Sequence, residues 1–206
     1  LMLYFSVPFA ILRLLLRDTH DSSWKRKLKN QLGIVQKISG QVIWIHCVSV
    51  GEFNASKPLI DKLFIQYSDH QIVVSTTTIT GSIAVNKHYK SKVIHCFFPF
   101  DIPLIINSYV NKINPEICIL LETEIWPNLI QSLKKKSIPV VLINARLSEK
   151  SFHRYDKYSS NLVKASLNNL NLICAQNTSS ADRFISLGAN QEKIITTGSL
   201  KFEEHT

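Results

Sequence analysis

Apolar, β-branched runs alternate with longer segments of mixed polarity along most of this chain. Seven such runs stand at residues 42–48, 72–76, 93–98, 117–121, 140–144, 172–175 and 194–198. Their near-continuous hydrophobicity is typical of strands covered on both faces, as in a parallel sheet. The mixed segments predict helices at residues 53–67, 80–89, 102–113, 125–136, 150–168 and 178–187. This alternation predicts an α/β fold, a Rossmann-like doubly wound parallel sheet.

The first 40 residues do not follow this pattern. Residues 1–17, LMLYFSVPFAILRLLLR, are apolar for most of their length, but Pro8 and Arg13 interrupt them. The uninterrupted part is shorter than the roughly 18–20 residues that cross a bilayer. We therefore expect residues 1–40 to form a membrane-anchor or interfacial helix with a basic linker, and residues 41–206 to form the α/β domain. The alternative is a buried N-terminal helix, but Arg13 and Arg17 argue against it.

The positive charge is concentrated in the same region. The chain has 24 Lys and Arg against 15 Asp and Glu, a net charge of +9. Residues 1–40 hold seven basic and two acidic residues, so +5 of that +9 lies there and +4 in the rest. A nucleic-acid partner would require a basic face across the fold. The sequence WKRKLK at residues 24–29 instead favours a membrane surface with anionic headgroups, on its cytoplasmic side.

Cysteine and histidine positions raise the question of a metal site. The four cysteines lie in separate apolar runs without a C-x-x-C pair, which is typical of reduced core thiols. The tripeptide IHC occurs at residues 45–47 and again at 94–96. Neighbouring strand residues point to opposite faces, so each pair offers one ligand to a shared ion. We expect no metal.

Polar residues follow the predicted strands, at the edge where open α/β sheets bind ligands. They are Ser49, Gly51 and Glu52 after the first strand, Thr77, Thr78, Thr80 and Gly81 after the second, Glu122 and Glu124 after the fourth, and Arg146 and Ser148 after the fifth. Carboxylates, hydroxyls and a cation at one edge favour an anionic or sugar-like ligand. Neither a Walker lysine nor a G-x-G-x-x-G fingerprint is present, so ATP and NAD are not expected cofactors.

The carboxylates admit two interpretations. Glu52 follows a glycine that would allow a tight turn, and it either caps the next helix or acts as a general base on a hydroxyl nucleophile. Glu122 and Glu124 would share one face if the strand continued, and their repulsion would raise a pKa. Alternatively, one of them caps the following helix and the other pairs with Arg146, while Ser148 is an ordinary capping serine.

Several of these segments resemble the Kdo (3-deoxy-D-manno-octulosonic acid) transferase family. The matching segments, in the family's order, are IWIHCVSVGEFNASKPLI, VSTTTITGS, FFPFD, ETEIWPNLI, INARLSEKSFHRY, AQNTSSADRFISLGA and TGSLKF. The resemblance implies an inverting glycosyltransferase of the two-Rossmann-domain (GT-B) type. Residues 41–206 would be its N-terminal, acceptor-binding half, and a C-terminal donor-binding domain is absent from these residues.

The resemblance also implies a reaction and roles. It would transfer Kdo from the donor CMP-Kdo to the lipid A precursor, lipid IVA, at the cytoplasmic face of the bacterial inner membrane, without a metal or other cofactor. Glu52 would be the base, one of Glu122 and Glu124 a second essential carboxylate, and Lys201 would lie near the interdomain cleft. The chain alone would be inactive. The competing hypothesis is a non-catalytic membrane-surface module that binds a phosphorylated lipid.

Overall fold

The centre of the protein is a sheet of seven parallel strands. The structure is a computed structural model that describes residues 22–200. The strands are β1 (Val42–His46), β2 (Gln71–Thr76), β3 (Ile94–Phe97), β4 (Ile117–Leu121), β5 (Val140–Ala145), β6 (Leu172–Ala175) and β7 (Ile194–Thr196). All seven strands predicted from the apolar runs are confirmed, with small differences at their ends.

Helices connect the strands as the mixed segments predicted. They are α2 (Ser22–Gln31), α3 (Val50–Gln66), α4 (Ile79–Tyr89), α5 (Pro103–Ile113), α6 (Pro127–Lys135), α7 (Glu149–Asn169) and α8 (Thr178–Ser186), with short 3₁₀ helices at Lys90–Lys92 and Gln191–Lys193. Proline stands at the start of α5 and α6, where its missing N–H costs nothing. The six predicted helices are confirmed, and α2 lies in the segment that we assigned to a basic linker.

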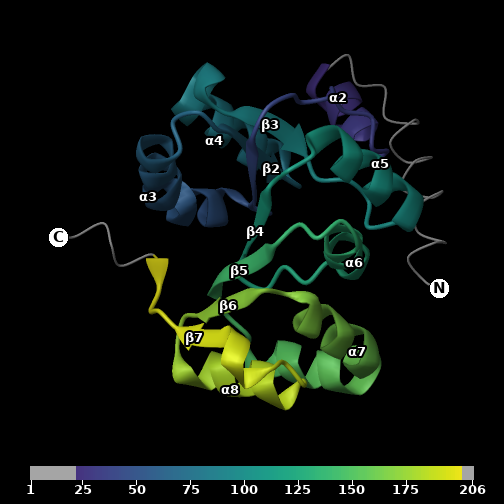
Figure 1. Cartoon of the computed structure of the whole chain (residues 1–206), viewed down its shortest axis with the longest axis vertical. Coiled ribbons are helices and arrows are strands. Elements are labelled where there is room, and N and C mark those ends of the chain that lie inside the picture. The colour runs from purple at the N-terminus through teal and green to yellow at the C-terminus, as the bar shows by residue number, and fades with distance from the viewer. Residues whose placement is uncertain (1–21, 201–206) are drawn as a thin grey trace.

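The strand order explains where a ligand site should lie. The order is β3-β2-β1-β4-β5-β6-β7, and every adjacent pair is parallel. Helices α3 and α4 pack on one face of the sheet, and α5, α6 and α7 pack on the other (Figure 1). The predicted doubly wound sheet is confirmed. Successive strands are added in one direction from β1 to β3 and in the other direction from β4 to β7. The switch point therefore lies between β1 and β4, and open sheets of this kind bind ligands there, at the carboxyl ends of the strands.

Alternate strand residues supply the two halves of the core. Trp44 and Leu120 point to the face covered by α5 and α6, whereas Ile45 and Leu121 point to the face covered by α3 and α4. Trp44 is fully buried, and its indole N–H donates to Ser75 Oγ at 2.8 Å. Burial on both faces accounts for the continuous apolar runs in the sequence.

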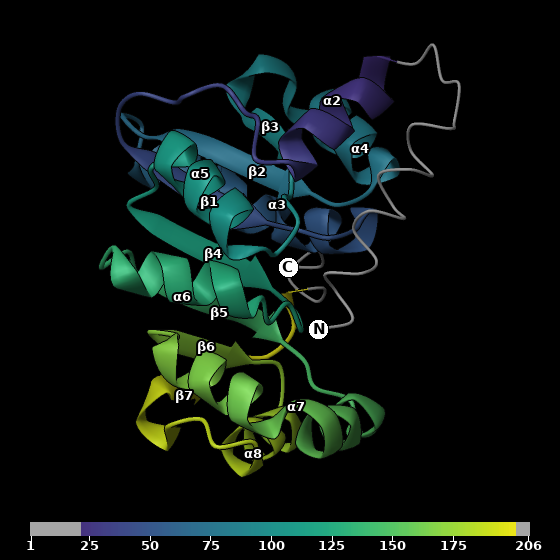
Figure 2. The same cartoon turned by 90° about the vertical axis from the view of Figure 1, so that its right-hand side faces the viewer.

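Helix α2 packs against the edge of the sheet. It lies beside β3 and α4 (Figure 2), and the side chains of Arg26 and Lys27 stand over the ring of Phe97. Asn30 is buried, and its Oδ1 accepts a hydrogen bond from the Phe97 N–H at 2.9 Å. Among residues 22–200, no helix is both long and apolar enough to cross a membrane.

Candidate active site

Glu52 lies at the start of α3, at the carboxyl end of β1. Its Oε2 accepts a hydrogen bond from the Val48 N–H at 2.8 Å, and its Oε1 accepts one from the Ser49 hydroxyl at 3.2 Å. Ser49 is the N-cap residue, and its Oγ accepts from the Glu52 N–H at 3.4 Å. These bonds form a variant of the capping box, in which the backbone donor to the glutamate is the Val48 N–H, and they hold the carboxylate in one position.

Burial makes this carboxylate unusually basic. Glu52 is 7% exposed, and desolvation raises its pKa above the ordinary value. The hydrogen bond from Val48 opposes that rise, whereas the negative charge of Glu122 adds to it. Glu52 is therefore both a helix-capping residue and a carboxylate that holds a proton more strongly than an exposed one.

The chain turns as soon as β4 ends. Glu122 has a φ of 56°, in the left-handed region that residues with a side chain rarely adopt, and its N–H donates to Ile143 O at 3.0 Å. The Thr123 hydroxyl donates to Arg146 O, which ties the loop after β4 to the loop after β5. The expectation that Glu122 and Glu124 share a face of a continuing strand is wrong, because a turn separates them.

The two glutamates nevertheless belong to one electrostatic group with Glu52. Burial raises the pKa of Glu124 to about 7, and the charges of Glu52 and then Glu122 add to that rise. Because β1 and β4 are adjacent strands, the switch point collects three carboxylates that repel one another, as their positions after the predicted strands suggested.

A different carboxylate caps α6. Asp101 follows β3, and its Oδ1 and Oδ2 accept hydrogen bonds from the Leu129 and Asn128 N–H groups at 2.9 and 3.1 Å. The proposal that Glu122 or Glu124 caps this helix is wrong, because Asp101 takes those donors. The sequence placed this aspartate at the ligand-binding edge within the segment PFD, but gave it no role.

The threonines after β2 are largely occupied by the fold. The Thr77 hydroxyl donates to Val48 O at 3.0 Å, and Thr78 Oγ1 accepts from the Gly81 N–H at 3.0 Å as the N-cap of α4. The Thr80 hydroxyl donates to Thr78 Oγ1 at 3.3 Å. A Cβ at position 81 would lie 2.9 Å from Thr78 Oγ1, so a glycine is required there. These groups brace the loops after β1 and β2.

The remaining residues selected from the sequence are more peripheral. Gly51 lies inside α3, and a Cβ there would meet nothing closer than 3.8 Å, so the expectation of a glycine-dependent turn is wrong. Arg146 and Ser148 are exposed, and Ser148 caps α7 by accepting from the Ser151 N–H at 3.2 Å. Lys201 lies outside the described residues.

Three buried side-chain nitrogens near the switch point were not identified from the sequence. In the part of the chain that the structure describes, His46 Nε2, Trp126 Nε1 and Asn144 Nδ2 are buried without a hydrogen-bond partner. Asn144 is the next-to-last residue of β5 and has a φ of 51°, and its Oδ1 accepts from the Leu200 N–H at 3.2 Å. A polar asparagine at the end of the apolar run 140–144 was the feature of the sequence that could have identified Asn144.

The histidines of the two IHC segments form hydrogen bonds with side chains of β2. His46 Nδ1 lies 2.9 Å from Ser75 Oγ, and His95 Nε2 lies 3.0 Å from Thr76 Oγ1. Burial lowers the pKa of His46 to about 3, so its ring is neutral. Within residues 22–200, no group of three or more potential metal ligands comes together.

Comparison with known proteins identifies the family. The sequence profile of the 3-deoxy-D-manno-octulosonic-acid transferase (kdotransferase) family matches residues 23–204. The chain belongs to the Kdo transferase family. The resemblance seen in the sequence is thereby confirmed, and the match includes α2, which the matching motifs had not covered.

Curated relatives carry the same name. The chain is 36% identical over 202 residues to the 3-deoxy-D-manno-octulosonic acid transferase of Haemophilus influenzae, with 97% of this chain and 47% of the relative covered. A protein of the same name from Chlamydia trachomatis is 29% identical, with 96% of this chain and 46% of the relative covered. The chain therefore spans about half the length of these relatives.

Solved structures agree on the fold. A UDP-N-acetylglucosamine 2-epimerase matches with a TM-score of 0.56 at 12% identity, covering 78% of this chain and 49% of that protein. The UDP-GlcNAc 2-epimerase of Neisseria meningitidis matches with a TM-score of 0.54 at 15% identity, covering 78% of this chain and 47% of that protein. The predicted correspondence to one half of a GT-B-type, two-Rossmann-domain protein is confirmed at the level of fold.

Proposed function

We propose that this domain binds the acceptor in an inverting transfer of Kdo from CMP-Kdo to the lipid A precursor, lipid IVA, with Glu52 as the general base. The observation that carries this proposal is the position of Glu52. It is a buried carboxylate with a raised pKa, held by two hydrogen bonds at the switch point of the sheet. Ligands of such sheets bind at that place.

The chemistry needs a base at this position. An acceptor hydroxyl is a weak nucleophile until a neighbouring group takes its proton as it attacks the anomeric carbon of Kdo. Glu52 takes that proton while the new carbon–oxygen bond forms. The bond from the anomeric carbon to the phosphate oxygen breaks on the opposite side, and CMP leaves with the negative charge, which inverts the configuration.

The second carboxylate has a separate task. At neutral pH Glu124, whose pKa is raised to about 7, is partly protonated beside Glu52. A protonated Glu124 donates a hydrogen bond and does not repel the ionised base. We therefore propose Glu124, and not Glu122, as the second essential carboxylate. Glu122 instead shapes the turn through its left-handed backbone.

Membership of the Kdo transferase family supports the identity of the donor and a location at the membrane. The domain equivalent to residues 22–200 would hold the acceptor, and a second Rossmann-like domain would bring CMP-Kdo to the crevice. We propose that the reaction takes place at the cytoplasmic face of the bacterial inner membrane, which the lipid nature of the acceptor and the basic residues of the first 40 positions favour. We propose that the loop of Thr77, Thr78 and Thr80, whose hydroxyls brace the neighbouring loops, borders the acceptor site.

The decisive experiment separates capping from catalysis at Glu52. In Glu52→Gln one amide oxygen still accepts from the Val48 N–H, but the basic oxygen is lost. With this chain joined to a donor-binding domain, we expect transfer to fall by about 10²–10⁴-fold with little change in melting temperature. Transfer is measured with CMP-Kdo and lipid IVA. Glu52→Ala should lose both activity and about 1 kcal/mol of stability.

Two results would count against the assignment. If Glu52→Gln keeps full turnover, Glu52 is a capping residue and another group is the base. If the unsubstituted chain, joined to the donor-binding domain, binds lipid IVA but transfers no Kdo, the hypothesis of a non-catalytic membrane-surface module that binds a phosphorylated lipid is favoured. The exposed Glu192 provides the matched control, since Glu192→Gln removes the same charge far from the carboxylate group.

A further inference from the structure

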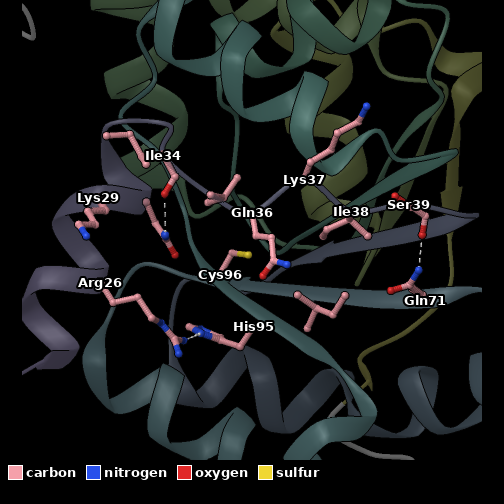
Figure 3. Close-up of a pocket in the computed structure, with 13 residues that line it drawn as sticks. Arg26, Lys29, Ile34, Gln36, Lys37, Ile38, Ser39, Gln71, His95 and Cys96 are labelled. Atoms are coloured by element: carbon pink, nitrogen blue, oxygen red, sulfur yellow. Dashed lines mark hydrogen bonds between the residues drawn. The ribbon is translucent and has the colours of Figure 1, made fainter.

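A cavity of about 600 Å³ lies at the edge of the sheet, between α2, residues 34–39 and strand β3 (Figure 3). Its volume is in the range of small-molecule binding sites. None of its lining residues belongs to the loops that follow β1, β4 or β5, where the carboxylates of the candidate active site lie. The cavity is therefore a separate feature of the molecule.

The charged residues around this cavity have one sign. Arg26 and Lys29 come from α2, and Lys37 stands on the opposite side (Figure 3). No Asp or Glu occurs among the described residues that line it. Three cations around a concave surface favour an anion, and a doubly charged phosphate monoester uses them better than a carboxylate does.

Arg26 is held in place at the cavity wall. Its Nη2 donates to His95 Nδ1 at 2.6 Å, and the other ring nitrogen of His95 lies 3.0 Å from Thr76 Oγ1. Burial, and then the Arg26 charge, lower the pKa of His95 to about 3, so the ring is neutral and accepts from the guanidinium. This bond orients Arg26 without neutralising its charge.

The floor of the cavity is apolar. It is formed by Val35, Ile38, Ile94 and Cys96, and Ile34 stands in the lining with 55% of its side chain exposed. Apolar surface next to cations suits an amphiphile that has an anionic head. No Phe, Tyr or Trp lines the cavity among the described residues, so a nucleobase would find no ring on which to stack.

We propose that this cavity binds the phosphate monoester headgroup of an anionic lipid, with the beginning of the acyl chain against the apolar floor. Residues 1–17 are a poorer occupant, because they hold Arg13 and Arg17 and no carboxylate and would add positive charge to three cations. The proposal does not rest on the transfer reaction. It concerns different residues, and either proposal can fail without the other.

The first test measures binding by the full chain. Titration calorimetry with soluble dihexanoyl phosphatidic acid should give saturable binding, and dihexanoyl phosphatidylcholine should give none. Inorganic phosphate, the other source of this anion, should bind at least about tenfold more weakly because it does not touch the apolar floor. Equal binding of the two lipids, or of phosphate and phosphatidic acid, would overturn the proposal.

The second test locates the site. Replacing Lys29 and Lys37 together by Gln should weaken binding of phosphatidic acid by about tenfold or more. Replacing the exposed Lys134 and Lys135 by Gln removes the same charge elsewhere and should change it less than about twofold. An equal loss in both variants would show attraction by net charge alone and would contradict a site in the cavity.

The third test addresses the apolar floor. Ile34→Ser should weaken binding of phosphatidic acid but leave the binding of inorganic phosphate unchanged. Ile65→Ser, on the surface of α3 with 82% exposure, is the matched control. Melting temperatures of all variants confirm folding. Unchanged affinity in Ile34→Ser would mean that the acyl chain does not enter the cavity and would sink the lipid assignment.

Discussion

Glu52 combines two roles, because the contacts that cap α3 also hold the carboxylate that we propose as the base. The sequence left capping and catalysis as alternatives, but the observed geometry is compatible with both. A cap needs an acceptor oxygen at the first turn of a helix, and a base needs a fixed, poorly solvated carboxylate. Burial of the capping box at the switch point supplies the second requirement.

Glu124 should make the free energy of unfolding depend on pH. Its pKa is about 7 in the folded protein against 4.5 for the ordinary group. Below pH 4.5 the carboxyl is neutral in both states and costs nothing. As pH rises towards 7 the unfolded chain ionises first, so stability is lost. The full cost above pH 7 is roughly 3 kcal/mol.

Glu124→Gln should remove this dependence. We expect the variant to be about as stable as the unsubstituted protein near pH 4, and more stable by up to roughly 3 kcal/mol near pH 8. Urea unfolding at the two pH values measures the difference. Glu192→Gln, at an exposed position, should show no such change. A constant difference between the two pH values would mean that Glu124 is not strained by burial and its neighbours.

The threonines after β2 make contacts that the sequence did not predict. The hydroxyls of Thr77 and Thr78 were expected at a ligand, but Val48 O and the Gly81 N–H occupy them. Spacing along the chain shows which residues reach the edge of the sheet. It does not show which polar partners from other loops meet them there, because those contacts depend on tertiary neighbours.

At the scale of elements, Asp101 joins the loop after β3 to the start of α6. Its carboxylate is 8% exposed and accepts from the Asn128 and Leu129 N–H groups. The N-cap residue of α6, Trp126, makes no capping hydrogen bond with its side chain. The first N–H groups of the helix therefore depend on an acceptor from the loop after β3.

Asp101→Ala should be strongly destabilising for this reason. Leaving two buried helix donors without an acceptor should cost about 2–3 kcal/mol in the free energy of unfolding. Asp101→Asn keeps an acceptor oxygen and should cost less. Chemical denaturation measures both, with Asp182→Ala on the exposed side of α8 as the control. Equal stability of Asp101→Ala and the control would show that water satisfies those donors.

The elements themselves were predictable because hydrophobic periodicity is a local signal. The seven apolar runs became seven strands, and prolines at 103 and 127 marked the first turns of α5 and α6. The turn after β4 was not predictable, since it depends on the hydrogen bond from the Glu122 N–H to Ile143 O on the neighbouring strand β5. A non-glycine residue with a positive φ gives no warning in a sequence.

At the scale of the whole molecule, strand order brings distant residues together. Glu52 and Glu124 are far apart in the sequence, yet they follow adjacent strands, β1 and β4, whose connecting helices leave to opposite faces. The crevice between those helices is where open sheets bind ligands. Fold class and candidate site were thus predictable together, since the alternation of strands and helices implies the shared edge.

Most helix N-termini at the same edge are closed to a phosphate. Helix N-termini attract anions through their free N–H groups. Here four of the helices that begin at this edge are capped by the chain's own side chains, which come from Ser49 for α3, Thr78 for α4, Asp101 for α6 and Ser148 for α7. Helix α5 has no side-chain cap, and Pro103 at its start removes one of its N–H groups. A nucleotide phosphate would have to displace these caps and would approach three carboxylates.

We therefore expect that residues 1–206 by themselves neither bind CMP nor transfer Kdo. Calorimetric titration with CMP should give no saturable heat, whereas the same chain joined to a donor-binding domain should bind it. CMP binding to these 206 residues with a Kd below about 1 mM would contradict this expectation. It would mean that this domain holds part of the donor site as well as the proposed acceptor site.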